Sequence, residues 1–310
     1  MTAHPDLLLS PEIAEALAAG APVVALETAI VTHGMPHPHN LSTARAVEAE
    51  IRAAGAIPAT IAVIDGVMRV GLTDAELERL AALPEGVRKA SARDLPAAIA
   101  AKVCAGTTVA GTMRIAAMAG IEIFATGGIG GVHRGAESTF DISADLTELG
   151  RTRTAVVCAG AKSILDLPKT LEVLETMGVP ILGAGTDAFP AFFSRTSGLS
   201  VDARLDGAGA LAAAIDANAR IGGAGMVICN PIPEADEIPA DRIAAIIDQA
   251  VEEAEARRIG GKGATPFLLG RVLELTGGDS LKANVALVRN NARVAGEIAV
   301  ALSSRRRDAA

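Results

Sequence analysis

The chain has 310 residues and a formal net charge of −8 at pH 7, and half of its residues are apolar, with six Phe and no Trp or Tyr. An acidic chain with so few aromatic side chains lacks both the clustered cations that bind a phosphate backbone and the rings on which single-stranded bases stack, so we expect no nucleic-acid partner. The length permits one large domain or two smaller ones, and a core of small aliphatic residues is typical of parallel strands covered by Ala-rich helices.

Strand-like apolar runs alternate with amphipathic, helix-like ones along the chain. The expected strands are 23–30, 59–64, 67–71, 121–126, 154–160, 179–185 and 225–233. The expected helices are 41–54, 73–82, 107–119, 143–150, 168–177, 207–220, 240–258, 265–276 and 280–303. This alternation predicts an α/β fold with a mostly parallel central sheet flanked by helices on both faces, an α/β/α sandwich.

Three further features refine this prediction. Asp65-Gly66 is a two-residue hairpin signal, so part of the sheet is expected to be antiparallel. No step in composition marks a domain boundary, and we expect residues 1–310 to form one domain. The final SSRRRDAA (303–310) is expected to be a frayed, solvated end.

The cysteines and the N-terminus bear on the cellular compartment. Cys104, Cys158 and Cys229 are odd in number and far apart, without CxxC spacing, so we expect buried reduced thiols and no zinc site. The opening residues MTAHPDLLLS carry no basic segment followed by an apolar one, and no eighteen-residue apolar run occurs. We therefore expect a cytoplasmic protein that does not bind a membrane.

A glycine-rich segment, ATGGIGGVHRGAESTFDISADL (125–146), follows one expected strand. Its glycines can turn backbone amides toward an anion such as phosphate, although a purely conformational role explains them equally well. The spacing does not match the GxGxxG dinucleotide pattern. Asp141 and Asp145 offer oxygen ligands to a hard divalent cation, Mn²⁺ or Mg²⁺, and the alternative is that Asp141 or Ser143 caps the next helix.

Glu27 interrupts the apolar run VVALETAI (23–30). Burial of an unpaired carboxylate is costly, so such a residue is paired, protonated or functional. A desolvated Glu makes a good general acid or base, whereas the structural alternative is a strand-end Glu paired with an Arg. The nearby segment THGMPHPHN (32–40) holds His33, His37 and His39 between prolines, and we expect an extended loop at the mouth of a pocket more than a metal site.

Lys162 follows the apolar run TAVVCAG (154–160). The carboxyl end of a parallel strand is where α/β proteins place their chemistry, and small apolar neighbours favour the neutral amine, which can attack a carbonyl carbon to form a Schiff base. The competing interpretation is that Lys162 pairs with a phosphate or with Asp166.

Seven long segments together resemble one known family over about residues 10–300, the pseudouridine-5'-phosphate glycosidases, also described as indigoidine-synthase-A-like proteins. They are VALETAIVTHGMP, PATIAVIDGVMRVGL, TTVAGTM, ATGGIGGVHRGAESTFDISADL, VVCAGAKSILDL, NPIPE and TPFLLGRVLELTGGDSLKANVALVRNNA. The resemblance implies cleavage of the C–C glycosidic bond of pseudouridine 5'-phosphate to uracil and ribose 5-phosphate, or the reverse, with a divalent metal, usually Mn²⁺. It also implies a single α/β domain that assembles as a homotrimer.

The resemblance implies roles for particular residues. The nucleophile falls on Lys162 in CAGAKS, the proton donor on Glu27 in VALET, and the metal-side carboxylate on Asp141 in TFDISAD. The substrate-contacting positions are Lys89, Thr108, Val109, Thr126, His133, Ser143, Ala144, Asp145 and Asn284. One departure is Thr28, where many relatives have Ser; it keeps the hydroxyl.

Two other functions use the same residues. A Schiff-base aldolase or lyase for a different sugar phosphate would use Lys162 but release no uracil. A non-catalytic phosphosugar-binding regulator would bind ribose 5-phosphate without forming a covalent adduct.

Overall fold

The computed structural model describes residues 4–82, 86–257, 259 and 264–308. Its strands are β1 (Leu7–Leu9), β2 (Val23–Leu26), β3 (Ile57–Ile64), β4 (Val67–Val70), β5 (Arg88–Ala90), β6 (Ala105–Thr107), β7 (Ile123–Ala125), β8 (Ala155–Cys158), β9 (Ile181–Ala184), β10 (Ala203–Leu205) and β11 (Met226–Cys229). Its α-helices are α1 (Pro11–Ala18), α2 (His39–Ala53), α3 (Asp74–Ala82), α4 (Leu95–Ala100), α5 (Val109–Ala119), α6 (Ala136–Thr139), α7 (Ala144–Leu149), α8 (Leu167–Thr176), α9 (Ala208–Arg220), α10 (Ala240–Ala256), α11 (Ala264–Leu275) and α12 (Asp279–Asp308). Shorter turns are the π-helix η1 (Ile30–Gly34) and the 3₁₀ turns η3 (Ala92–Asp94) and η4 (Glu234–Asp236).

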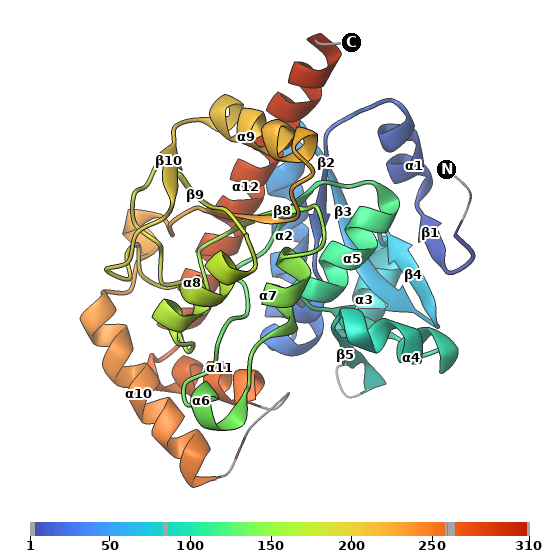
Figure 1. Ribbon diagram of the computed structural model, residues 1–310. Helices are drawn as coiled ribbons and strands as arrows, with labels where there is room; N and C mark the ends of the chain where they lie inside the picture. Colours follow the sequence, from blue (N-terminus) through green and yellow to red (C-terminus); the bar gives the residue numbers. More distant parts are fainter. Residues whose placement is uncertain (1–3, 83–85, 258, 260–263, 309–310) are drawn as a thin grey trace.

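The described strands form one mixed sheet, which runs across Figure 1 from β1 at the right to β10 at the left, with helices in front of it and behind it. The order is β1-β4-β3-β2-β7-β8-β11-β9-β10, and β6 pairs with β3 and with β5. Within the described residues only β3–β4 and β3–β6 are antiparallel pairs. The Asp65-Gly66 turn joins β3 to β4 with φ of +50° and +83°, as the two-residue hairpin requires.

The two sides of β3 explain how distant segments meet. β2 lies parallel to the first half of β3, with Leu26 opposite Thr60. β6 lies antiparallel to the second half, with Gly106 opposite Ala62. The carboxyl ends of β2 and β6 therefore run toward each other along one edge of β3.

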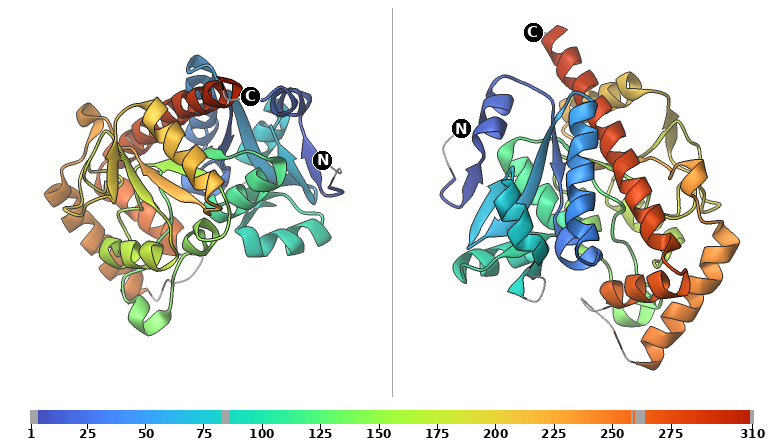
Figure 2. Two further views of the ribbon diagram at one scale, coloured as in Figure 1. Left: turned by 45° about the horizontal axis from the view of Figure 1, so that its top comes forward. Right: turned by 180° about the vertical axis from the view of Figure 1, so that it is seen from behind.

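Helices cover both faces of the sheet. On one face α12 crosses the sheet and packs between α2 and α9, as the view from behind in Figure 2 shows. On the other face lie α5, α7 and α8. All four residues of β2, β8 and β11 are buried, as expected for strands that are covered on both sides. No helix in the described part of the chain is long and apolar enough to cross a bilayer.

The predicted fold class is confirmed: a single domain with a mostly parallel central sheet flanked by helices. The strand expected over 23–30 is too long, because β2 ends at Leu26 and the chain turns into η1, where Thr32 N and its hydroxyl both donate to the Thr28 carbonyl. The segment 32–40 is accordingly not an extended loop throughout. The sequence prediction missed the three-residue strands β1, β5, β6 and β10, which are too short for alternation to be visible.

The C-terminal segment also differs from expectation. α12 continues to Asp308 instead of fraying after 303, because its arginines are paired. Arg306 contacts Glu122 and Asp216, and Arg305 contacts Asp216. Among the cysteines, Cys158 and Cys229 are buried, whereas Cys104 is only partly buried and donates to Asp65.

Candidate active site

The sheet has a switch point between β2 and β7, which are neighbouring parallel strands. After β2 the chain passes through α2 to β3 on one side, and after β7 it passes through α7 to β8 on the other. Connections that diverge in this way leave a crevice at the carboxyl ends of the two strands. A cavity of about 390 Å³ opens there.

All site residues predicted from the sequence line this one cavity. They are Glu27, Lys89, Thr108, Val109, Thr126, His133, Asp141, Ser143, Ala144, Asp145, Lys162 and Asn284. The structure therefore brings together residues from six separate stretches of chain, and the chemical role of each remains a prediction.

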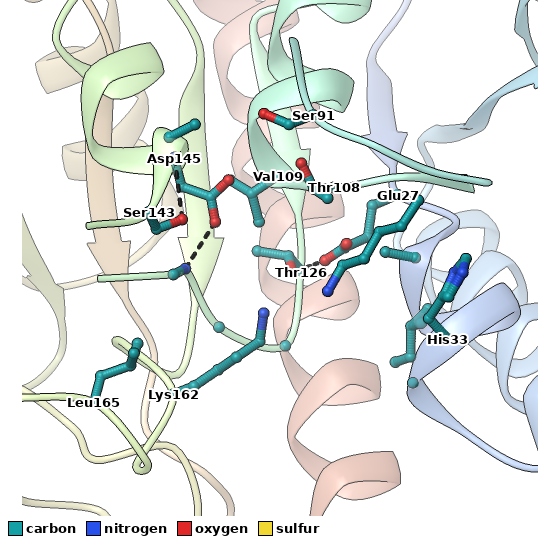
Figure 3. A pocket seen from close by; sticks show the side chains of 18 of the residues that line it. Glu27, His33, Ser91, Thr108, Val109, Thr126, Ser143, Asp145, Lys162 and Leu165 are labelled. Atoms are coloured by element: carbon teal, nitrogen blue, oxygen red, sulfur yellow. Dashed lines mark hydrogen bonds between the residues drawn. The ribbon is translucent and has the colours of Figure 1, made fainter. Parts of the chain in front are cut away.

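Glu27 lies at the end of β2, directly at the switch point. Thr126, at the end of β7, donates a hydrogen bond from its hydroxyl to the Glu27 carboxylate (Figure 3). Burial raises the pKa of Glu27, and the neighbouring Lys162 and the Thr126 hydrogen bond oppose this shift only in part. Among the described residues Glu27 forms no ion pair with an arginine, so that structural alternative is wrong. A carboxyl with a raised pKa can carry a proton near neutral pH.

Lys162 reaches the cavity from the turn after β8. Gly160 has φ +78°, and a Cβ there would lie 2.1 Å from the Pro190 carbonyl oxygen, so only glycine fits this turn. Lys162 N donates to the Ile129 carbonyl at 3.1 Å, and the side-chain amine points into the cavity toward the Glu27–Thr126 pair (Figure 3).

The Lys162 amine makes no hydrogen bond or ion pair within the described part of the chain. Asp166, the alternative partner considered from the sequence, caps α8 and pairs with Lys169 at 2.9 Å. The amine is thus directed at the cavity and not at Asp166.

The antiparallel part of the sheet supplies the opposite wall. Lys89 lies on β5, paired in register with Gly106 of β6, and it is close enough to Glu27 to lower the pKa of that carboxyl. Thr108 follows β6 and caps α5 by accepting from Gly111 N at 3.4 Å. Because β6 points at the end of β2, this wall faces Glu27 directly.

Asp145 joins the two walls. Its carboxylate accepts from Ala110 N at the start of α5 at 2.9 Å and from Gly130 N in the glycine-rich turn at 2.8 Å, and the residue is only 5% exposed. A Cβ at Gly130 would lie 2.2 Å from Ser143 Oγ, so this glycine permits the close approach. The Ser143 hydroxyl accepts from Asp145 N, which confirms the capping interpretation of Ser143 while leaving it on the cavity wall.

His133 and Asp141 lie on the same segment of the wall. Burial lowers the pKa of His133, nearby Lys162 and Lys89 lower it further, and Asp141 opposes the shift. Among the described residues the Asp141 carboxylate accepts no hydrogen bond, and no group of three His, Cys, Asp or Glu stands together as a metal cage. One available carboxylate fits a hard divalent ion that keeps most of its waters, and it does not fit zinc.

The structure adds residues that the sequence did not indicate. Ser91 and Arg93 line the cavity from the turn after β5, and Phe140 and Phe192 line it from loops. The hydrogen-bonded Ser91–Asp94 pair has the spacing of a capping box, the one signal that could have drawn attention to this turn. Ser91 Oγ and the predicted Asn284 Oδ1 are buried and have no hydrogen-bond partner among the described residues, as expected of atoms that contact a ligand.

The histidine-rich segment contributes one residue to the cavity. His33 lines the wall, its Nδ1 lies 2.6 Å from Thr32 Oγ1, and burial lowers its pKa. His37 and His39 are exposed, and among the described residues they form no metal-binding group with His33.

The helix α12 supports the backbone at the switch point through side-chain hydrogen bonds. Asn291 of α12 is fully buried and donates to the Thr126 carbonyl at 2.8 Å, while it accepts from Asn230 Nδ2 at 2.9 Å. This pair fixes the backbone that carries the Glu27 partner. This pair could not be predicted from the sequence, because buried asparagines have no periodic pattern.

The fold and the site together define an α/β protein with a lysine and a buried carboxyl in a switch-point cavity. The chain belongs to the indigoidine synthase A-like family, whose model matches residues 12–301. It is 59% identical to the pseudouridine-5'-phosphate glycosidase of Methylobacterium nodulans over 98% of this chain and 90% of that one, and 59% identical to that of Escherichia coli over 95% of each. The crystal structure of the prealnumycin C-glycosynthase AlnA with ribulose 5-phosphate superposes with a TM-score of 0.91 at 41% identity, over 99% of this chain and 100% of that one.

Proposed function

We propose that this protein reversibly cleaves the C–C glycosidic bond of pseudouridine 5'-phosphate, giving uracil and ribose 5-phosphate. The observation that carries the proposal is that the Lys162 amine and the raised-pKa carboxyl of Glu27 face one cavity at the switch point. The names of the relatives support the substrate, and the ligand of AlnA supports a pentose phosphate.

A C–C glycosidic bond has no leaving heteroatom, so protonation of a glycosidic oxygen by paired carboxylates does not apply. Instead, the Lys162 amine attacks C1', the C1'–O4' bond breaks, and the proton lost by the amine goes to O4', which becomes the hydroxyl of the opened ribose. Glu27 then gives a proton to the uracil carbon, which departs with the electrons of the C–C bond and leaves an iminium between C1' and the lysine nitrogen. Water hydrolyses the iminium and releases ribose 5-phosphate.

The 5'-phosphate is held at the wall built by the glycine-rich turn. Lys89 supplies a positive charge, and Thr126, His133 and Ser143 supply hydrogen bonds, the neutral imidazole of His133 still having one N–H to donate. Asn284 Oδ1, which is buried and has no hydrogen-bond partner in the described part of the chain, suits the N–H of a uracil ring. Anchoring of both ends positions C1' against Lys162.

Asp141 is the residue that would hold Mn²⁺, mainly through waters, with Mg²⁺ as the other candidate. When bound, such an ion supplies positive charge that positions the anionic substrate. A homotrimer, expected from the family resemblance, is likewise a proposal that sedimentation velocity tests.

The proposal is tested by two measurements on the same preparation. Uracil release from pseudouridine 5'-phosphate with Mn²⁺ is followed by chromatography, and intact mass is measured after incubation with ribose 5-phosphate and borohydride. We expect uracil and a reduced adduct of one pentose phosphate per chain. If neither uracil nor the reduced adduct is formed, the proposal is contradicted.

A second candidate is C–C bond chemistry on a pentose phosphate with a partner other than uracil. The ribulose 5-phosphate complex of AlnA, a C-glycosynthase, favours it. A borohydride adduct without uracil release would select this candidate.

A further inference from the structure

Glu27 is shared by two cavities. Besides the main cavity, it lines a second one of about 20 Å³ on the far side of the Glu27–Thr126 pair. The second cavity lies between the sheet and the α2–α12 layer, because its other lining residues come from β3, β7, α2 and α12. Glu27 thus forms part of the partition between the substrate cavity and a small buried space.

The second cavity is suited to a single water molecule. Its volume exceeds the 10–15 Å³ or so that one water needs. Thr43 and Thr60 line it, and they are only 4% and 3% exposed. The Thr43 hydroxyl has no hydrogen-bond partner among the described residues, so a water there would meet Glu27, Thr43 and Thr60, the two to four polar partners that buried waters have.

Thr60 connects this space to a second carboxyl. Its hydroxyl donates a hydrogen bond to Glu48 Oε1 of α2. Burial raises the pKa of Glu48, as it does for Glu27. Glu48 lies next to Arg45 and Arg52, whose side chains are 44% and 51% exposed, so it reaches the solvent-facing side of α2.

We propose that Glu48, Thr60 and one water in the second cavity form a proton relay between Glu27 and solvent. This inference rests on the proposed function, since it concerns how Glu27 exchanges the proton used at the uracil carbon. A bound nucleotide fills the main cavity and blocks that side of Glu27. The second cavity lies on the other side of Glu27 and leads through Thr60 to Glu48.

Proton movement along the relay is balanced. In the direction of bond formation, Glu27 gives its proton to the water, the water gives one to Thr60 Oγ, and Thr60 gives its own to Glu48, as its hydrogen bond already points. In the direction of cleavage the hydroxyl rotates, protonated Glu48 donates to Thr60, and one proton arrives at Glu27. The threonine and the water are unchanged, and one proton passes from one carboxyl to the other.

The charges around the two ends differ. Glu27 faces Lys162, Lys89 and Asp145. Glu48 faces Arg52, Asp74 and Arg45. The second cavity between them is lined by threonines, aliphatic side chains and Gly127. Apart from the Glu27 carboxyl, the threonine hydroxyls are the only proton-transfer groups among its lining residues.

The test uses Glu48→Gln and Thr60→Val, which keep side-chain size and remove the transfer group. Rapid-quench measurement gives the rate of the first uracil release and the rate of later turnovers. We expect a first turnover close to wild type, because Glu27 is loaded before substrate binds, and later turnovers slowed about tenfold, less than the 10²–10⁴-fold or so that loss of a general acid costs. Thr60→Ser retains the hydroxyl and is expected to restore the later turnovers.

Glu50→Gln is the matched control, since Glu50 is on the same helix and pairs with Arg289 away from the cavity. Wild-type later turnovers in both relay variants, or equal slowing of first and later turnovers, would overturn the relay. The borohydride adduct of the wild type is independent of Glu48, so its absence would indicate failure of the proposed function and not of the relay.

Discussion

The parallel and antiparallel parts of the sheet contribute different chemistry to one cavity. The parallel part delivers Glu27, Thr126 and Lys162 from the ends of β2, β7 and β8, the groups proposed to make and break bonds. The antiparallel part delivers Lys89, Thr108 and Val109 from β5 and from the residues after β6, the groups proposed to bind and orient the substrate. Each part has a lysine in the cavity, so residue type alone does not distinguish them, and the proposal assigns the covalent step to Lys162 because its amine points toward Glu27 and Thr126 (Figure 3).

We expect the largest effect on activity from Lys162→Ala. We expect loss of the borohydride adduct and a fall in kcat of about 10⁴-fold or more, because the covalent route is removed. Lys169→Ala is the matched control, an exposed lysine paired with Asp166 and Glu137. An adduct on folded Lys162→Ala protein would move the nucleophile elsewhere.

Glu27→Gln keeps the shape of the side chain and its contact with Thr126 but carries no transferable proton. We expect the ribose 5-phosphate adduct to form and uracil release to fall about 10²–10⁴-fold. Unimpaired uracil release would remove Glu27 from the proton-transfer role.

Glu27→Gln also tests the raised pKa of Glu27 through the pH dependence of protein stability. Because the folded state raises the pKa of Glu27, it binds more protons than the unfolded chain, and wild-type stability is lost as pH rises through the raised pKa. Melting temperatures of wild type and Glu27→Gln should therefore diverge with rising pH, the variant being the more stable at high pH. A constant difference from pH 4 to pH 9 would contradict the raised pKa.

Lys89→Ala tests the proposed binding role of the antiparallel part of the sheet. We expect the adduct to form at saturating substrate and KM to rise about 10- to 100-fold, the loss of one charge-assisted contact worth about 1.5–3 kcal/mol. Arg88→Ala is the control, because its exposed side chain points away from Lys89 on the same strand. A reversed result, with the adduct lost in Lys89→Ala and kept in Lys162→Ala, would exchange the roles of the two parts.

Asp145→Asn weakens the hydrogen bonds that connect the start of α5 to the glycine-rich turn. An amide can accept from only one of Ala110 N and Gly130 N and sets its NH₂ against the other. We expect a loss of about 1–3 kcal/mol in the free energy of unfolding and a higher KM. Denaturant titration and steady-state kinetics measure the two effects, and wild-type stability would show that these hydrogen bonds are dispensable.

Thr28→Ser should have the smallest effect. Thr28 is fully buried, and its hydroxyl donates to the Ile61 carbonyl and accepts from Thr107 N where β2 and β6 meet. Serine keeps both bonds and loses one methyl, so we expect at most about 1 kcal/mol of destabilisation and unchanged kcat. A large loss of activity would mean that the methyl group shapes the site.

The longer helices and strands could be predicted because their apolar periodicity is strong, whereas α1, α4 and α6 were missed. The glycine-rich segment, Glu27 and Lys162 drew attention because they interrupt apolar runs, whereas Lys89, Val109 and Asn284 were indicated only by the family resemblance. The sequence could not predict that β2 and β6 meet end to end, because strand order depends on tertiary pairing and β6 has only three residues. The Asn230–Asn291 pair and the Ser91 turn were missed because a contact 61 residues apart and a short turn leave no periodic signal.

The position of α12 has a consequence for folding. Asn284 and Asn291, which line and support the cavity, both lie in α12, whereas Glu27 lies on β2, far away in the sequence. Contacts of such long sequence range form only after the intervening chain has been ordered. Until α12 packs against the sheet, Glu27 and Lys162 therefore lack the helix that supports their side of the cavity, so the geometry of the site depends on one of the longest-range contacts of the fold.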